Sequence, residues 1–169
     1  MDFSQAVNAA MRMLAEPAHT LFVGQSVRYD GAAIYHSLEG VPMEKRLDFP
    51  VVENLQLGYC TGLSLTGVLP ICIYPRMDFM LLAMDQLVNH LDKLPAFGWS
   101  PKVIIRCRVG AKRPLDAGPQ HTQNYTSAFR QMLTTVAVYE LRRPEDVAPA
   151  YALAMNSNRS TIIVENPLV

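Results

Sequence analysis

Short, mostly uninterrupted apolar runs alternate along the chain with stretches of helical period. The runs are rich in leucine, isoleucine and valine, and they occupy residues 20–23, 49–52, 69–74, 102–107, 136–141 and 161–164. Strands of this composition are typically buried on both faces of a parallel sheet that helices cover. The sequence therefore predicts an α/β fold of three layers, with a mainly parallel six-stranded sheet between two layers of helices.

The segments between the apolar runs are mainly helical in pattern. In residues 78–94 apolar side chains recur every three or four positions, and Asp78 is placed to cap the helix. The segments 25–46 and 108–121 hold several glycines and prolines and are expected to be mainly loop. Since no repeat or linker divides the sequence, we expect a single domain over 1–169. The helices are expected at about 4–15, 54–67, 78–94, 122–133 and 145–156.

The charge and cysteine content exclude several classes of protein. Fifteen basic and fifteen acidic residues cancel, so no overall field favours nucleic acid or an anionic membrane surface. We find neither a signal-peptide pattern nor an apolar run near the roughly 18 residues of a membrane span. The three cysteines are odd in number and widely spaced, which fits neither a disulfide framework nor a zinc site. We expect a cytoplasmic protein with reduced thiols.

Several familiar catalytic motifs are missing from the sequence. There is no G-x-x-x-x-G-K-[ST] loop for a nucleoside triphosphate and no G-x-G-x-x-G loop for a dinucleotide. The serine motif G-x-S-x-G is absent as well. No histidine shares a helix-spaced ligand pair with a second histidine or cysteine, so no metal site is predicted.

Two polar features remain as candidates for chemistry. Glu53 follows an apolar run and begins a predicted helix, which is a crevice-forming position in an open α/β sheet. The simpler interpretation is that Glu53 caps the helix. The second feature is His121, at the end of the long loop, where acid–base chemistry or an ordinary loop role are both open.

Taken in order, nine segments carry a resemblance to a known family. The most specific are Asp78-Phe79 followed by Asp85-Gln86-Leu87-Val88-Asn89, and then Gln120-His121-Thr122-Gln123. The sequence resembles the pyrimidine-binding domain of the beta subunit of the 2-oxo acid dehydrogenase decarboxylase component, in the transketolase-like superfamily. The resemblance covers nearly the whole chain, although beta subunits normally continue into a C-terminal domain beyond the equivalent of Val169. The segments are 22–25, 49–53, 58–70, 78–79, 85–89, 93–94, 104–106, 118–123 and 162–165.

The resemblance implies roles for individual residues. Glu53 matches the glutamate that hydrogen-bonds the aminopyrimidine of thiamine diphosphate and activates the cofactor, and His121 matches a histidine near the reacting carbon. The sequence departs from the family at 73–77, where a glutamate and a stacking aromatic residue are replaced, and Gln25 replaces a usual acidic residue. We therefore assign cofactor packing to Tyr59, Met77 or Phe79, and substrate binding to Arg76 and Gln120.

The resemblance also implies a partner, because the family binds the cofactor between two domains. The partner is an alpha-type subunit that holds the diphosphate and Mg²⁺, most simply in a heterotetramer of two subunits of each type, and the chain alone is expected to be inactive. The charged fraction of 18%, below the usual ~25%, agrees with a covered surface. So does a helix on which Gly58 and Gly62 lie one turn apart, open to close packing.

The expected function is decarboxylation with acyl or ketol transfer on a 2-oxo acid or ketose. Transfer to a lipoyl carrier and a small biosynthetic reaction, forming an acyloin or a modified sugar, both remain open. The alternative of a different class is a non-catalytic assembly or regulatory subunit of the same fold. A stand-alone flavodoxin-like ligand-binding domain is a more distant third.

Overall fold

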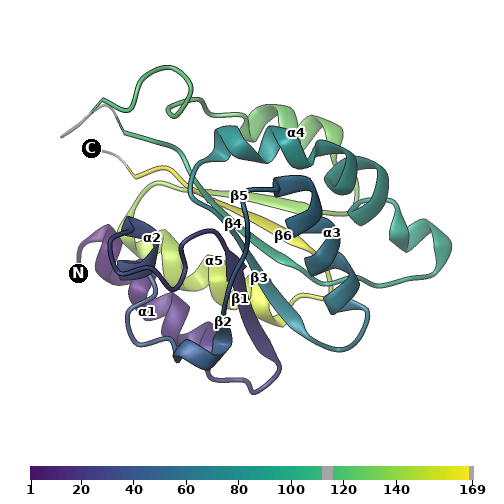
Figure 1. Ribbon diagram of the computed structural model, residues 1–169. Coiled ribbons are helices and arrows are strands. Elements are labelled where there is room, and N and C mark those ends of the chain that lie inside the picture. Colours follow the sequence, from purple (N-terminus) through teal and green to yellow (C-terminus); the bar gives the residue numbers. More distant parts are fainter. Residues whose placement is uncertain (112–115, 168–169) are drawn as a thin grey trace.

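The computed structural model describes residues 1–111 and 116–167, and Figure 1 shows its arrangement in layers. Within these residues all neighbouring strands pair in parallel, in the order β2-β1-β3-β4-β6-β5. The predicted three-layer α/β fold is thus confirmed. Residues 112–115 of the predicted loop at 108–121 lie outside the described part. The strands are β1 (Thr20–Gly24), β2 (Arg46–Asp48), β3 (Leu69–Tyr74), β4 (Ile104–Arg108), β5 (Ala137–Leu141) and β6 (Thr161–Glu165).

Helices cover both faces of the sheet (Figure 1). On one face α1 (Phe3–Ala15) and α5 (Pro144–Asn156) pack on Ile71, Ile73 and other alternate residues of the central strands. On the opposite face α3 (Glu53–Ser64) and α4 (Thr126–Met132) pack on the intervening residues, among them Cys72 and Ile105. Because successive residues of a strand point to opposite faces, uninterrupted apolar strands supply both cores. None of the described helices has the length and apolar character that crossing a bilayer requires.

In place of the α-helix expected at 78–94, the structure has three short consecutive helices of other types. The first, η2 (Met77–Ala83), is a 3-10 helix, η3 (Asp85–Leu91) is a π-helix, and η4 (Leu94–Phe97) is again 3-10. Buried Met77, Met80 and Ala83 are three residues apart, which is the period of a 3-10 helix. Asp78 does not cap this segment; its Oδ1 accepts a hydrogen bond of 3.3 Å from the backbone N–H of Gln123.

The second strand also differs from its prediction at 49–52. The strand β2 ends at Asp48, and Val51 and Val52 are 75% and 44% exposed in the turn that leads into α3. Pro50 has no N–H to donate to a sheet, so an apolar run that contains it is a poor strand. The apolar pattern there marks a surface segment.

Buried Asp92 joins the end of η3 to the segment before β5. Its Oδ1 accepts hydrogen bonds from the backbone N–H groups of Thr134, Thr135 and Val136, at 2.9, 2.7 and 3.1 Å. Its Oδ2 accepts from the Lys93 ammonium group at 2.7 Å. Burial alone would raise the pKa of Asp92, but Lys93 and these N–H donors together hold that pKa well below its usual range.

A buried arginine fixes the connection between β1 and β2. Arg46 is 6% exposed, and its guanidinium donates hydrogen bonds to the carbonyl oxygens of Val27, Leu38 and Val41. The guanidinium carbon also lies 4.9 Å from the ring centre of Tyr35. This connection includes α2 (Ala33–His36) and η1 (Met43–Lys45), and Arg46 thereby holds α2 against the end of the sheet.

Candidate active site

A cavity of about 330 Å³ opens at the carboxyl ends of the central strands. Its walls come from the segment after β1, from α2, from the ends of β3, β4 and β6, and from the loop that carries His121. The chain leaves β1 for the edge strand β2 and returns on the other side of β1 as β3. Ligands of open α/β sheets bind at such a reversal of strand order, outside the carboxyl ends of the strands. The position of this cavity therefore makes it the candidate site.

Glu53 lies directly behind the cavity wall. Its side chain is 4% exposed, and its Oε1 accepts a hydrogen bond of 3.0 Å from the Gln25 amide. The hydroxyl of Tyr74 donates to the backbone carbonyl of Glu53 at 3.0 Å, and both Gln25 and Tyr74 line the cavity. The first turn of α3 has no side-chain cap. The Glu53 carboxyl group thus accepts from Gln25 and does not cap the helix.

A glycine brings these groups together. A Cβ atom at Gly24 would lie 2.7 Å from the carbonyl oxygen of Ile73 in β3. Only glycine allows the end of β1 to approach β3 this closely. The next residue, Gln25, is thereby placed between the cavity and Glu53.

His121 also lines the cavity. Its ring meets the ring of Phe79 edge-on, with centres 5.5 Å apart, and both residues line the cavity. The backbone beneath it is packed on Gly110, where a Cβ atom would lie 1.9 Å from the His121 carbonyl oxygen. Phe79 and Gly110 therefore fix the position of His121.

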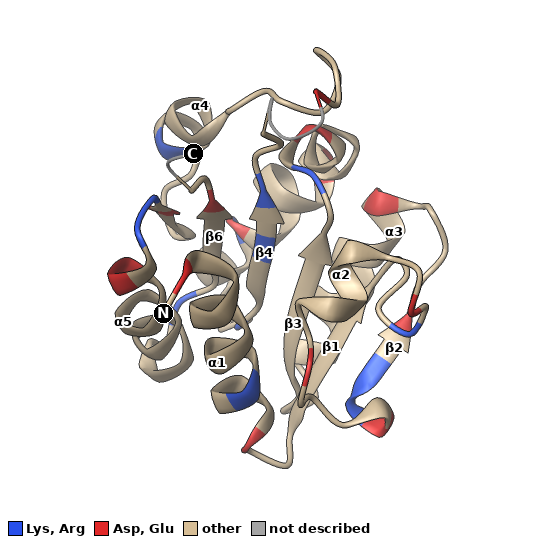
Figure 2. Cartoon of the chain, turned by 90° about the vertical axis from the view of Figure 1, so that its left-hand side faces the viewer, with Lys and Arg blue, Asp and Glu red and all other residues tan. Residues whose placement is uncertain are grey.

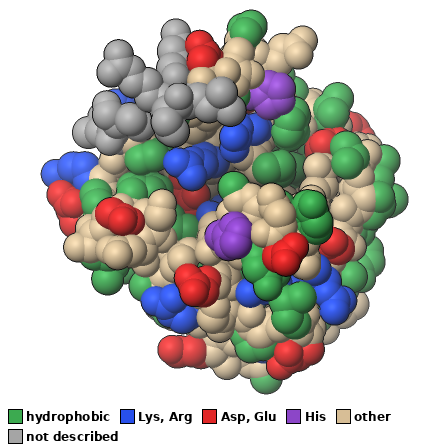
Figure 3. All heavy atoms as spheres, turned by 60° about the vertical axis from the view of Figure 1, so that its left-hand side comes forward, with side chains coloured by type: hydrophobic (Ala, Val, Ile, Leu, Met, Phe, Trp, Pro, Cys, Tyr) green, Lys and Arg blue, Asp and Glu red, His purple; other side chains and the backbone are tan. Residues whose placement is uncertain are grey.

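Charged residues also line the cavity. Arg76, Arg106 and Arg108 all contribute to its wall, and Figure 2 shows the basic positions of β4 next to an acidic position at the end of β6. Arg106 and Glu165, both nearly fully buried, form a two-pronged pair, with Nε–Oε1 and NH2–Oε2 distances of 2.7 and 3.1 Å. In the space-filling view of Figure 3 basic side chains gather around a hollow in this face.

Further hydrogen bonds complete the Arg106–Glu165 pair. The NH1 group of Arg106 donates to Ser37 Oγ at 2.8 Å, and the hydroxyl of Tyr151 donates to Glu165 Oε1 at 2.8 Å. Burial alone would lower the pKa of Arg106, but the carboxylate of Glu165 raises it overall. This network was not predicted from the sequence. The sequence feature that could have indicated this network is a charged residue within or just after each of two apolar strands, β4 and β6.

The structure brings some of the predicted site residues together and separates others. Arg76, Phe79 and His121 line the cavity, and Glu53 joins it through Gln25. The other three cofactor or substrate candidates do not line it. Met77 is fully buried in the core, Gln120 is exposed in a turn, and Tyr59 is 41% exposed on α3, where it packs on Phe49.

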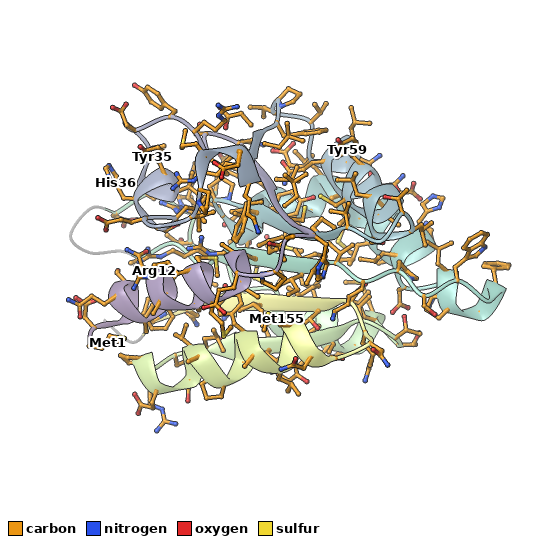
Figure 4. The ribbon with its side chains drawn as sticks, turned by 90° about the horizontal axis from the view of Figure 1, so that it is seen from below. Met1, Arg12, Tyr35, His36, Tyr59 and Met155 are labelled. Atoms are coloured by element: carbon orange, nitrogen blue, oxygen red, sulfur yellow. The ribbon has the colours of Figure 1, made fainter. Side chains whose placement is uncertain are left out.

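The side-chain view agrees with this division. Figure 4 shows Tyr59 well apart from Tyr35 and His36 of α2, whose segment forms one wall of the cavity. Met77 was expected to face the cofactor, but its sulfur accepts a hydrogen bond of 3.2 Å from the backbone N–H of Tyr125 inside the core. Among residues 1–111 and 116–167, no group of three or more His, Cys, Asp or Glu side chains is placed to hold a metal ion.

Comparison with known proteins agrees with the resemblance stated above. The chain is 29% identical over 140 residues to the pyruvate dehydrogenase E1 component subunit beta of Cyanidium caldarium, an alignment that covers 78% of this chain and 42% of the relative. It is 25% identical over 175 residues to the mitochondrial subunit beta of Ascaris suum, covering 97% of this chain and 46% of the relative. The chain thus spans less than half the length of these curated relatives. No protein-family model matches the sequence.

Solved structures agree on the fold. The transketolase of Campylobacter jejuni superimposes with a TM-score of 0.78 at 14% identity, over 98% of this chain and 26% of that protein. An inactive beta4 tetramer of split-gene transketolase superimposes with a TM-score of 0.73 at 16% identity, over 98% of this chain and 51% of that chain. The fold is therefore transketolase-like, and the sequence relatives are E1 beta subunits.

Proposed function

We propose that this chain is the beta-type subunit of a two-component thiamine diphosphate enzyme that acts on a 2-oxo acid or a ketose. The reaction class is decarboxylation with acyl or ketol transfer. The observation that carries the proposal is the buried carboxyl group of Glu53 behind a cavity at the carboxyl ends of the strands. In a chain whose relatives are E1 beta subunits, that group is the one expected to contact the cofactor's aminopyrimidine.

The residues around the cavity fit the pyrimidine end of this cofactor. The ring of Phe79 and the apolar side chains of Ala32, Ala33 and Ile34 line the cavity and suit a flat heterocycle. Glu53 supplies a carboxyl group that can exchange a proton with a ring nitrogen, and the Gln25 amide orients it through Oε1. When bound, the cofactor supplies the nucleophilic carbon for attack on the substrate carbonyl.

His121 takes the second role in the proposal. Its imidazole lines the cavity with its ring plane held by Phe79, so it can give or accept a proton on a bound substrate. Arg76, in the same wall, is proposed to hold the substrate's acidic group. These roles follow the site residues assigned from the sequence.

The proposed partner is an alpha-type subunit that carries the diphosphate and Mg²⁺, in a heterotetramer with two subunits of each type. An apolar surface on α3 and η2, which pack against each other, supports a docked partner. No atom of the described residues lies within 4 Å of a Cβ placed at Gly62 on α3, so this helix face is open. The exposed apolar side chains of this surface are Val51, Val52, Leu55, Tyr59, Leu81 and Leu82.

A specific observation favours a second candidate, a non-catalytic assembly or regulatory subunit. Position 73 is a fully buried isoleucine in the core, and position 76 brings an arginine into the cavity. Both lie in the segment where the sequence departs from the family pattern. Glu53 and His121 at the cavity favour the catalytic alternative.

The test is calorimetric titration of thiamine diphosphate with Mg²⁺ into the chain alone and then into its mixture with an alpha-type subunit. We expect binding only in the mixture, and loss of cofactor-dependent activity in Glu53→Gln. The matched control is Glu44→Gln, which changes an exposed glutamate in η1 and should leave activity intact. A wild-type mixture that assembles but never binds the cofactor would refute the catalytic proposal in favour of the assembly subunit.

A further inference from the structure

The cavity wall holds more positive than negative charge. Of the three arginines that line it, only Arg106 has its charge matched, because Glu165 is already bound to it through both oxygens. Arg76 and Arg108 line the same cavity, and among the described residues neither forms a salt bridge. Glu165 is the only carboxylate among the described residues of the cavity wall, so no acidic side chain of that wall matches the charges of Arg76 and Arg108.

Arg76 also has an unsatisfied donor. Its NH1 group donates to the carbonyl oxygen of Pro75 at 2.8 Å, but its buried Nε has no hydrogen-bond partner among the described residues. Buried polar groups without a partner are rare in folded proteins and commonly mark a ligand or ordered water. Here the group belongs to a residue that lines a cavity.

The two arginines act on each other across this site. Burial lowers the pKa of Arg76, the neighbouring charge of Arg108 lowers it further, and Asp78 opposes both effects. Asp78 gives only partial compensation, since its Oδ1 accepts from the backbone of Gln123 and no salt bridge joins it to Arg76 among the described residues. An anion between the two guanidinium groups would relieve this repulsion.

Part of the cavity wall is small and apolar. Ala32, Ala33 and Ile34 of the α2 segment line the same cavity as the arginines. Ser26, which also lines the cavity, has a φ of 56°, a left-handed conformation that is uncommon for non-glycine residues. A ligand that fits this cavity has a compact anionic head and a short body.

We propose that Arg76 and Arg108 form a two-arginine subsite for a small oxyanion, either the carboxylate of a 2-oxo acid or the phosphate of a phosphorylated substrate. Planar guanidinium groups bind both anions through paired N–H donors. Arg106 is a positioning residue in this arrangement, because its bonds to Glu165 and Ser37 fix the strand that carries Arg108. The subsite extends the proposed function. It rests on that function only in so far as the bound anion is taken to be part of the substrate.

The test measures thermal unfolding of the full chain without cofactor or partner. Pyruvate and inorganic phosphate are titrated separately, with ionic strength held constant by sodium chloride. A ligand that binds only the folded chain raises the unfolding midpoint with its concentration. We expect one of the two anions to raise it. Stabilisation by pyruvate identifies a carboxylate subsite, and stabilisation by phosphate identifies a phosphate subsite.

Variants separate the subsite from a general effect of salt. Arg76→Gln and Arg108→Gln should each weaken anion affinity by roughly tenfold or more. Arg130→Gln changes an exposed arginine on α4 that does not line the cavity, and it should leave the affinity unchanged. Because Arg108 is exposed, its variant should fold even if the Arg76 variant does not. In anion-free buffer Arg108→Gln should leave the midpoint unchanged or raise it, since a like-charge neighbour is removed.

The subsite is refuted if neither anion stabilises the wild-type chain, or if Arg130→Gln weakens binding as much as Arg108→Gln does. These outcomes are independent of the Glu53 experiment, because no cofactor or partner is present. Anion binding with no cofactor activation would retain the subsite and refute the catalytic proposal. Cofactor activation with no anion binding would support the catalytic proposal and refute the subsite.

Discussion

The buried pair of Arg106 and Glu165 gives the sharpest quantitative prediction. Replacing Arg106 by methionine leaves the Glu165 carboxylate, 3% exposed in its side chain, with the hydroxyl of Tyr151 as its one remaining side-chain donor among the described residues. Breaking a buried ion pair in this way costs about 3–5 kcal/mol of the free energy of unfolding. Glu165→Leu leaves the Arg106 guanidinium with Ser37 as its remaining partner and should cost a similar amount.

The double variant is expected to be more stable than either single variant. Arg106→Met together with Glu165→Leu removes both charges and leaves the buried hydroxyl of Tyr151 without its acceptor, whereas the Ser37 hydroxyl still donates to the carbonyl oxygen of Ile34. One unsatisfied buried hydroxyl costs about 1–3 kcal/mol, so the double variant should lose about 2 kcal/mol. Replacing a buried pair by apolar side chains removes the desolvation cost of both charges.

Urea unfolding followed by circular dichroism measures these differences. With a slope of about 2 kcal/mol per molar, each single variant should move the midpoint down by roughly 2 M and the double variant by roughly half as much. If the loss in the double variant equals the sum of the two single losses, the side chains are not coupled and the reasoning is wrong. A loss below about 1 kcal/mol in both single variants would also refute it.

Three further predictions concern other parts of the chain. Asp92→Asn should cost about 2–3 kcal/mol at neutral pH in urea unfolding, because charge-assisted bonds to buried donors are lost. Since the folded-state pKa of Asp92 is depressed, its contribution is complete above the unfolded value of about 3.9, and the gap between wild type and variant should shrink as pH falls below that value. Gly62→Ala should raise the unfolding free energy by about 1 kcal/mol, as an exposed helix position with open space beside it, and a thermal melt that shows destabilisation would contradict this. Gly110→Ala should displace the His121 backbone, so cofactor-dependent activity in the reconstituted enzyme should fall while the far-ultraviolet circular dichroism spectrum stays unchanged.

The sheet was largely predictable because its strands are uninterrupted apolar runs. Such runs are explained only by burial on both faces, which requires two layers of helices. The prediction failed where Pro50 lies inside an apolar run, and where residues 77–91 mix spacings of three and four. In the second case Met77, Met80 and Ala83 follow a three-residue period, which the general helical pattern concealed.

The candidate site was predictable only in part. Glu53 and His121 were singled out by their positions in the sequence and the resemblance supplied their roles; in the structure His121 lines the cavity and Glu53 joins it through Gln25. The contact of Glu53 with Gln25 spans 28 positions and that of Arg106 with Glu165 spans 59, so neither follows from local spacing. Tyr59 and Met77 were chosen by residue type, but the side of the helix on which each lies takes it away from the cavity.

Arg46 holds the connection between β1 and β2 mainly through the main chain, and this affects which substitutions the protein can accept. Its guanidinium binds three main-chain carbonyl groups, at Val27, Leu38 and Val41, and the side chains at those positions take no part in the hydrogen bonds. Substitutions within α2 at positions other than Tyr35, whose ring packs on the guanidinium, therefore leave this anchor in place. Because α2 forms part of the cavity wall, substitutions there can change ligand preference during evolution while the sheet and Glu53 stay unaltered.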